Sequence, residues 1–370
     1  MQWTLQITSR SALLLGLGLI TIRIGTLKKA GLDTFRPYIN YNSDTWVASA
    51  RYRFYGKAYP YQYTDKFGDI SFPEYAWVGY NFEDSSQLQA GLNQVPFGIL
   101  PYFSSSITET LGYTLGLEDV YQLGVKYKTR INGWDVQGGY YLRPTWQGKG
   151  TSKDGVTYSN VPARADSYVE EGSNNSESNM LALRMTKTVD VGGWKTEFGG
   201  SVLSSTLENN DTNANGRRNA AAVHMSSAKG AWSTGLLAAR QQMSPRNPDN
   251  SDVVTFGGYD SSYNIASRGN LLTAYLNYDV NGSYLGGWLS NIRIYGNYSA
   301  FLKSGNGYEN TQRYIAGVSF ASEKYVYIAT EWLFGKNDPY VGGSSYTQSL
   351  AAGGTDHWGS QVTISIGCYF

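Results

Sequence analysis

Apolar and polar residues alternate with a period of two along almost the whole chain. After Trp134, for example, Val136 and Leu142 share the face of the tryptophan, whereas Asp135 and Gln137 lie on the opposite face. This is the period of a β-strand, and almost no window shows the period of an amphipathic helix. We therefore predict strands at residues 34–41, 45–55, 73–82, 86–96, 119–130, 134–143, 179–189, 194–205, 218–228, 231–242, 269–280, 288–303, 311–321, 324–334 and 357–370.

The connections between these strands alternate in length. The short ones are residues 42–44, 83–85, 131–133, 190–193, 228–230, 281–287 and 322–324. The long ones are residues 56–72, 97–118, 144–178, 206–217, 243–268 and 335–356, with a shorter one near 304–310. Outer-membrane barrels have tight periplasmic turns and long extracellular loops, and about 9–11 residues suffice for a tilted strand to cross the bilayer. A soluble β-sandwich is the alternative, but it has no reason to sort its loops by length.

The direction of the last strand fixes the number of strands. Residues 357–370 follow a long loop and therefore descend to the periplasm, and counting back makes residues 34–41 descend as well. Bacterial barrels close with an even number of strands, so one ascending strand must come first. The alternating segment 19–28 is the candidate. The predicted fold is an all-β, transmembrane antiparallel β-barrel of sixteen strands, a single domain over residues 19–370, with residues 1–18 as a signal remnant or an irregular N-terminus.

Five tryptophans begin an ascending strand directly after a short turn. They are Trp46, Trp134, Trp194, Trp232 and Trp288. Indole rings are enriched where a membrane meets water, because the ring is apolar and its N–H is polar. We therefore predict that these residues form a periplasmic aromatic girdle at one depth.

Composition agrees with a β-structure between lipid and water. The 370 residues include 43 Gly, 31 Tyr and only 10 Pro, and charged residues make up 16%. The mean hydropathy of −0.37 excludes a helical membrane protein. The net charge of +1 provides no field that would attract nucleic acid, so we expect no nucleic-acid partner.

The chain offers little material for catalysis or metal binding. Its histidines are His224 and His357, and its one cysteine is Cys368. Outer-membrane lipases and proteases need a histidine that accepts a proton, and neither histidine lies in a recognisable motif. We therefore predict no catalytic residue, no metal site and no cofactor.

One segment resembles a known family. Residues 88–106, "LQAGLNQVPFGILPYFSSS", contain Gly91 and the sequence V-P-F-G at 95–98. This is similar to the phosphate-selective-type porin family, in which a G-x-x-x-V-P-F-G segment ends the fifth strand, here 86–96. The resemblance implies a sixteen-stranded, water-filled barrel, often a homotrimer, whose third extracellular loop folds inward as a constriction. That loop would be residues 97–118. The family does not fix the solute, since many relatives are general or sugar porins.

The last strand ends in an aromatic residue, Phe370, after apolar residues at alternate positions. This resembles the outer-membrane assembly signal of bacterial barrels and implies recognition by the barrel-assembly machinery. A barrel of this kind would also contact outer-membrane lipid and lipopolysaccharide.

Charged residues on the predicted lumen face are the candidate pore residues. Arg36, Arg51 and Arg53 lie on adjacent strands and are expected to form a basic patch opposite the inward loop. Arginine and lysine in a narrow pore attract anions, whereas arginines that pair with acids only line a wet wall. The predicted lumen and constriction residues are Arg36, Arg51, Arg53, Lys126, Lys128, Arg143, Arg293, Arg313, Phe103 and Glu109.

Together these patterns predict an outer-membrane porin that allows passive diffusion of small hydrophilic solutes. Within this class the alternative is an anion-selective or oligosaccharide-selective channel, the latter because tyrosines also fall on the lumen face. From other classes, the alternatives are a closed structural or surface-recognition barrel and a barrel enzyme.

Overall fold

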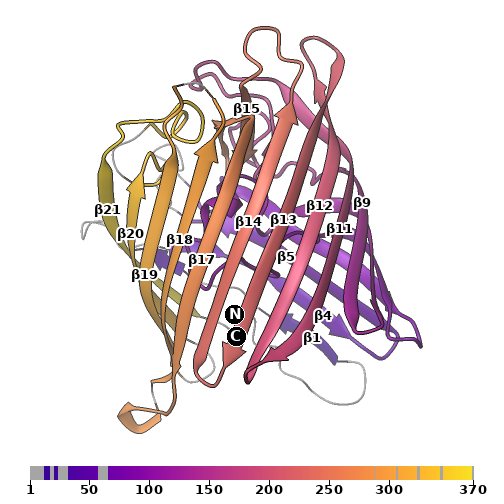
Figure 1. Cartoon of the computed structure of the whole chain (residues 1–370), viewed down its shortest axis with the longest axis vertical. Helices are drawn as coiled ribbons and strands as arrows, with labels where there is room; N and C mark the ends of the chain where they lie inside the picture. The colour runs from indigo at the N-terminus through magenta and orange to yellow at the C-terminus, as the bar shows by residue number, and fades with distance from the viewer. Residues whose placement is uncertain are drawn as a thin grey trace.

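A computed structural model describes residues 12–16, 21–23, 32–56, 66–287, 289–305, 307–322, 326–341 and 345–368. The regular secondary structure of the chain is almost entirely β-strand (Figure 1). Two residues singled out by the sequence, Trp288 and Phe370, lie outside the described residues.

One large antiparallel sheet forms the wall of the molecule (Figure 1). Its strands are β1 (Ala12–Gly16), β2 (Thr21–Arg23), β3 (Leu32–Phe35), β4 (Tyr38–Asn42), β5 (Trp46–Tyr55), β6 (Ser71–Asn81), β7 (Gln87–Gln94), β8 (Tyr121–Ile131), β9 (Trp134–Pro144), β11 (Asn175–Val191), β12 (Trp194–Asn209), β13 (Ala214–Lys229), β14 (Trp232–Ser244), β17 (Arg268–Val280), β18 (Ser290–Lys303), β19 (Thr311–Ser322), β20 (Val326–Lys336) and β21 (Trp358–Cys368). The other elements are a second small sheet of β10 (Val161–Pro162), β15 (Val253–Gly258) and β16 (Ser261–Ala266), the helix α1 (Leu111–Thr114) and the 3-10 turn η1 (Leu285–Gly287).

Pairing between the first and last strands closes the large sheet on itself. β1 pairs with β4, and β2 pairs with β3. These four short strands therefore take the places of two full-length strands in the wall, which we count as two positions. β2 also pairs with β21, where Ile22 lies opposite Ile366. The eighteen strands of the sheet therefore fill sixteen positions, which confirms the predicted barrel. The first position begins at Ala12, ahead of the predicted residue 19. A closed sheet leaves no unpaired edge, as a β-chain in lipid requires.

After the first position, the observed strands of the wall match the predicted ones closely, with two differences. The predicted strand 34–41 is interrupted at Pro37, which cannot donate a hydrogen bond to the ladder. The prediction of a long loop at 206–217 is wrong, because β12 continues to Asn209 and β13 begins at Ala214. These two strands form a hairpin longer than a bilayer requires, so their upper part stands above the membrane.

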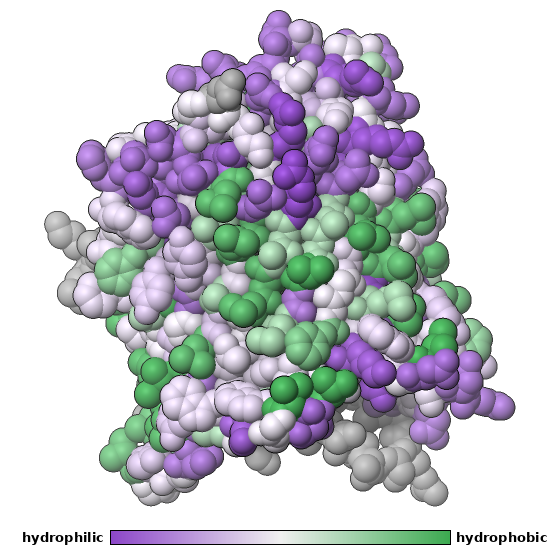
Figure 2. Space-filling view, in the orientation of Figure 1, coloured by the Kyte–Doolittle hydropathy of each residue, from purple (hydrophilic) through white to green (hydrophobic). Residues whose placement is uncertain are grey.

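The outer wall carries an apolar band. Alternate side chains of β11, β12 and β13 are exposed, among them Leu181, Val202 and Val223. Figure 2 shows apolar residues across the middle of this wall and polar residues above them. Such a band is the lipid-facing surface of a transmembrane barrel. Within the described ranges, no helix is long and apolar enough to span a bilayer.

Four of the predicted girdle tryptophans begin strands after short turns. Trp46, Trp134, Trp194 and Trp232 are the first residues of β5, β9, β12 and β14. All four are at least partly exposed, and Trp46 packs edge-on against Tyr80 of the next strand, with 5.0 Å between ring centroids. These rings share the short-turn end of the wall, which is the arrangement expected of a girdle.

The barrel interior is occupied by long loops. Residues 95–120 contain α1, and residues 145–174 and 245–267 supply β10, β15 and β16. Every residue of the hairpin strands β15 and β16 is buried. Buried apolar side chains of the loops join those of β11–β18 in one core cluster. Much of the long-loop half of the barrel is therefore packed like a protein core rather than left as an open tube.

Gly91, the first glycine of the family-like segment, is required by the packing of β7 on β6. Its φ is +120°, and a Cβ there would meet the carbonyl oxygen of Ala76 and lie 2.9 Å from the Cα of Trp77. We expect Gly91→Ala to lower the free energy of unfolding by about 3 kcal/mol, the upper range for a strained backbone position. Urea unfolding in detergent measures this. Gly138→Ala is the matched control, because its Cβ would meet nothing within 4 Å. Equal costs for both variants would contradict the prediction.

Candidate functional site in the barrel interior

The loop 95–120 crosses the interior from β7 to the opposite wall. Arg184 of β11 donates from Nε to the carbonyl oxygen of Gly98 (2.7 Å), and the Gly98 amide donates to Ser201 Oγ of β12 (2.9 Å). Further along, the Leu111 amide donates to Ser299 Oγ of β18 (3.1 Å). Since β7 and β18 are well separated around the wall, the loop spans the lumen.

Glu331 of β20 fixes the middle of this loop. Its Oε1 accepts a hydrogen bond from the Ile107 amide (2.6 Å), and its Oε2 accepts bonds from the amide (3.1 Å) and hydroxyl (2.6 Å) of Thr108. The Tyr295 hydroxyl donates to the same carboxylate (2.8 Å). Charge-assisted hydrogen bonds are stronger than neutral ones, so a single wall residue holds two backbone amides and one hydroxyl of the loop in place.

Phe103 does not line a pore. Its side chain is 1% exposed and lies in the core cluster between the loop and the wall. A Cβ at Gly98 would lie 2.5 Å from its ring, and one at Gly112 would lie 2.8 Å away, so both glycines make room for it. The prediction that Phe103 belongs to the constriction is therefore wrong, because the loop buries its apolar side chains against the wall.

The structure brings Arg36, Arg51 and Arg53 together around one carboxylate, that of Glu74 on β6. Arg36 Nε lies 3.6 Å from Glu74 Oε1, while Arg51 and Arg53 make closer ion pairs with the same group. The Glu74 side chain is fully buried, whereas those of Arg36 and Arg51 are 20% and 18% exposed. This arginine group has three positive charges and one negative charge, so it presents a surplus of positive charge to the lumen.

A β-bulge places Glu74 in the lumen. Along β6, strict alternation would put Glu74 on the same face as the exposed Val78 and Tyr80. The pairing with β5 shifts where Tyr75 gives way to Pro73, and Glu74 is the extra residue. An extra residue reverses the side-chain alternation and re-aims one side chain. This is why the period of two did not identify Glu74 as a lumen residue.

Tyrosines from two other loops cover the arginine group. The Arg53 guanidinium lies 4.9 Å from the Tyr158 ring centroid and 5.1 Å from that of Tyr259. Arg53 Nη1 also donates to the hydroxyls of Tyr259 (3.2 Å) and Tyr55 (3.0 Å). On its other side, the Tyr158 hydroxyl donates to Asp119 of the crossing loop. The arginine group and the loop are therefore separated by little more than one aromatic ring.

The crossing loop contains three carboxyl groups, which we call the acidic loop residues. The charges of the arginine group act on Glu109 and Asp119. Glu118 lies next to Asp119 and accepts hydrogen bonds from the amides of Phe103 (2.7 Å) and Thr110 (3.2 Å). Burial raises the pKa of Glu118 to about 7 and that of Asp119 to about 6. The pKa of Glu109 is also raised, by burial and then by Asp119 and Glu118, while the charges of Arg53 and Arg36 oppose this rise. These residues and the arginine group together form the candidate constriction.

Two other predicted arginines are neutralised by acids. Arg293 pairs with Asp279 (Nε–Oδ1, 2.5 Å) and donates to Ser105 Oγ of the crossing loop (3.3 Å). Arg313 is fully buried, pairs with Asp338 (Nε–Oδ2, 2.7 Å) and donates to a backbone carbonyl of the same loop (3.4 Å). They hold the loop against the wall, and their charges are compensated locally.

The remaining predicted lumen cations have different positions. Lys126 is buried, and its Nζ donates to the carbonyl oxygen of Gln94 at the base of the crossing loop (2.7 Å). Lys128 is half-buried. Arg143 does not line the lumen, because a bulge in the β8–β9 pairing puts it opposite Leu123, on the face of the exposed apolar residues of β8. The prediction that Arg143 lines the lumen is therefore wrong, because a β-bulge reverses the alternation of side chains, as it also does at Glu74.

The arrangement can sort solutes by charge, but it does not supply a set of metal ligands. In the described part of the chain, no group of three or more His, Cys, Asp or Glu residues is placed to hold a metal ion. Fixed positive charge on one wall and titratable carboxyls on the facing loop produce a field across the constriction. Such a field acts on ions and polar solutes that pass between them.

Solved structures with the same architecture are outer-membrane proteins. The anion-selective porin from Comamonas acidovorans has a TM-score of 0.60 at 13% identity, over 98% of this chain and 100% of that one. The trimer form of OmpT, an outer membrane protein of Vibrio cholerae, has a TM-score of 0.57 at 12% identity, over 98% and 100%. The outer membrane channel DcaP of Acinetobacter baumannii has a TM-score of 0.57 at 12% identity, over 97% of both chains. No protein-family model and no curated protein sequence matches the chain.

These similarities extend over nearly the full length of each chain. The chain therefore has the fold of the outer-membrane β-barrels, with short turns at one end and long loops at the other. This agrees with the apolar outer band and with the closed sheet.

Proposed function

We propose that this protein is a porin of the bacterial outer membrane, through which small hydrophilic solutes diffuse passively. The observation that carries the proposal is the constriction, in which the arginine group on the wall faces the acidic loop residues. A closed scaffold has no need of opposed buried charges in its lumen, whereas a channel uses them to select solutes. An enzyme is not proposed, because the constriction has neither a positioned nucleophile nor a histidine.

Planar-bilayer recording of the purified protein tests this proposal. A porin gives stepwise, ohmic increases in current when it inserts, and a closed structural barrel gives none. Liposome swelling with neutral sugars of increasing size then reports the size limit. Insertion without conductance would overturn the proposal.

A second candidate is an anion-selective channel. The observation that favours it is the surplus positive charge of Arg36, Arg51 and Arg53 over Glu74, together with the partial exposure of Arg36 and Arg51. One of the similar structures is that of the anion-selective porin from Comamonas acidovorans. The family-like segment around 95–98 adds no evidence for phosphate as the solute. The reversal potential in a salt gradient decides between this candidate and a general porin.

Three further parts of the proposal concern partners. We propose a homotrimer, as in the trimer form of Vibrio cholerae OmpT, and insertion by the barrel-assembly machinery through Phe370. We also propose contacts of the apolar band with lipid and lipopolysaccharide. Cross-linking in native membranes tests the trimer, and Phe370→Ala is expected to slow assembly.

Ion selectivity is expected to depend on pH near neutrality. Burial raises the pKa of Glu118 to about 7 and that of Asp119 to about 6, so these two carboxyls lose negative charge as the pH falls from about 8 to about 5. The arginines stay charged, so the anion-to-cation permeability ratio should rise over this range. Reversal potentials at a series of pH values measure the change. Asp119→Asn should reduce this change, whereas Asp84→Asn, in an exposed turn, should not. A ratio that is constant with pH would contradict this assignment.

A further inference from the structure

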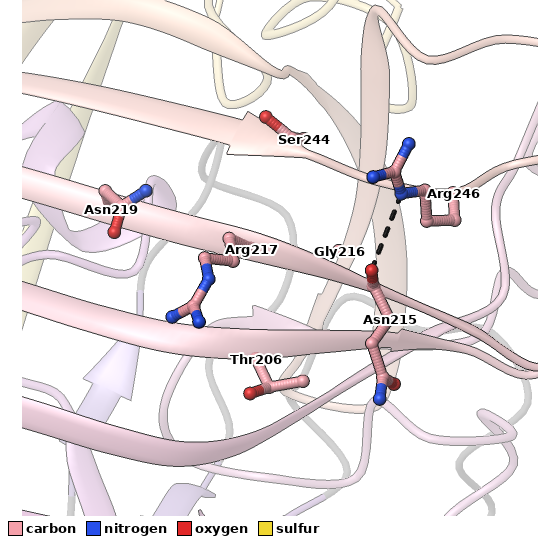
Figure 3. Close-up of a pocket in the computed structure, with 7 residues that line it drawn as sticks. All are labelled: Thr206, Asn215, Gly216, Arg217, Asn219, Ser244 and Arg246. Carbon is pink, nitrogen blue, oxygen red and sulfur yellow. Dashed lines mark hydrogen bonds between the residues drawn. The ribbon is translucent and has the colours of Figure 1, made fainter.

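Two adjoining hollows lie on the outer face of the wall formed by β12, β13 and β14. The upper one, of about 480 Å³, is polar and is lined by residues that include Thr206, Arg217 and Arg246 (Figure 3). The lower one, of about 560 Å³, is lined mainly by apolar side chains, among them Leu183 and Val202, with Arg240 at its edge. Asn219 borders both hollows, so together they form one continuous amphipathic groove.

The boundary between the two hollows lies at the outer edge of the membrane. Arg240 is eight residues beyond the girdle residue Trp232 on β14. With ~3.4 Å per residue and a strand tilt of ~40°, it lies roughly 20 Å above the girdle, near the top of an apolar band ~25 Å tall. Arg217 pairs with Ser244, four residues further along β14, so it lies roughly 10 Å higher. The arginines therefore occupy the headgroup level of the outer leaflet.

The three arginines are available to an anion. All are exposed, and none takes part in an ion pair within the described ranges. Arg240 Nη1 makes a long hydrogen bond to Asn270 Oδ1 (3.4 Å), and Arg246 Nε a long one to the carbonyl oxygen of Asn215 (3.5 Å; Figure 3). Among the described residues, most N–H groups of these three arginines therefore have no hydrogen-bond acceptor.

We propose that this groove binds the phosphorylated glycolipid of the outer leaflet, the lipid A part of lipopolysaccharide, an inference that rests on the proposed contact of the wall with lipopolysaccharide. The phosphates would bind between Arg217, Arg240 and Arg246, because guanidinium groups recognise phosphate with paired hydrogen bonds. An acyl chain would lie along the apolar hollow beside Leu183 and Val202. The positive charge of the three arginines and their depth at the headgroup level both favour a phosphorylated lipid as the ligand. A zwitterionic lipid provides no net negative charge for three arginines.

Native mass spectrometry of the full chain in detergent, titrated with diphosphoryl lipid A, tests the site. Binding is expected to weaken roughly fivefold for each arginine of Arg217, Arg240 and Arg246 that is changed to Ala. Lys187→Ala is the matched control. Lys187 is an exposed cation on the same wall at the opposite end, 5.5 Å from the Trp134 ring centroid, and its loss should not change binding. Because all four side chains are exposed, the variants should fold, and heat-modifiable gel migration verifies this.

A comparison of different lipids distinguishes recognition of the phosphates from nonspecific lipid binding. Phosphatidylethanolamine and dephosphorylated lipid A should bind more weakly than diphosphoryl lipid A. Glu208→Gln should bind at least as tightly as the native protein, because Glu208 is an exposed acid at the upper rim of the groove, opposite Asn215. The proposal is overturned if the triple arginine variant binds lipid A as the native protein does. It is also overturned if Lys187→Ala costs as much, or if inorganic phosphate alone displaces the lipid.

Discussion

Replacing Arg51 by alanine is expected to shift the ion preference of the channel towards cations. Arg51 is the partly exposed member of the arginine group that lies on β5, and Glu74 keeps Arg53 and Arg36 as partners when it is lost. A unit charge ~6 Å from a permeating ion changes the energy of that ion by about 0.7 kcal/mol in water, with opposite signs for an anion and a cation, so the anion-to-cation permeability ratio should change roughly tenfold. The reversal potential in a salt gradient measures this shift.

Two other variants make this test specific. Glu74→Gln removes the negative charge of the same group and should move the reversal potential in the opposite direction, towards anions. Arg143→Ala is the matched control, because the bulge in the β8–β9 pairing places Arg143 on the outer face of the wall. An unchanged reversal potential in Arg51→Ala, or an equal shift in Arg143→Ala, would mean that the ion path does not pass the arginine group.

Removing the hairpin of β15 and β16 is expected to raise the single-channel conductance severalfold. Every residue of both strands is buried. The hairpin bridges two sides of the barrel, because Tyr259 reaches Arg53 of β5 while the Arg218 guanidinium of β13 lies 5.2 Å from the ring centroid of Phe256. The Tyr263 hydroxyl also donates to the Thr114 carbonyl oxygen of the crossing loop (2.7 Å). Deletion of this hairpin therefore removes two buried strands and their side chains from the lumen.

The ends of the hairpin allow a clean deletion. The amide of Ser267 donates to the carbonyl oxygen of Asp252 (2.8 Å), so a Gly-Gly link can replace residues 253–266 without moving the strands. Replacing the tip of the β12–β13 hairpin, residues 210–213, by Asn-Gly is the control. This change shortens a different, exposed loop that stands above the wall and does not fill the lumen. Tyr259→Ala is a milder variant that should raise the conductance less. A deletion mutant that conducts like the native protein would show that the solute path passes beside the hairpin.

The wall of the barrel could be predicted from the sequence because its determinants are local. Alternation decides where a strand runs, and a short turn such as 131–133 decides where it reverses. The even strand count then required an additional first strand, and β2 lies within the segment predicted for it, paired with β21. The error at 206–217 arose because the polar ends of β12 and β13 stand above the membrane, so they carry no apolar alternation.

The constriction could be predicted only in part. Arg36, Arg51 and Arg53 were found together because they lie on neighbouring strands, and neighbours in a meander are neighbours in space. Glu74 was missed because one extra residue in β6 reverses the alternation, and nothing in the pattern marks that residue as extra.

What the sequence alone determined is therefore the barrel: its strands, their directions and their number. What only the tertiary structure decided is the content of the lumen. The bulge at Glu74, the outward position of Arg143 and the burial of Phe103 each depend on pairing or packing between distant segments. A period of two records which face of a strand is apolar, but it contains no information about which loop fills the space that those strands enclose.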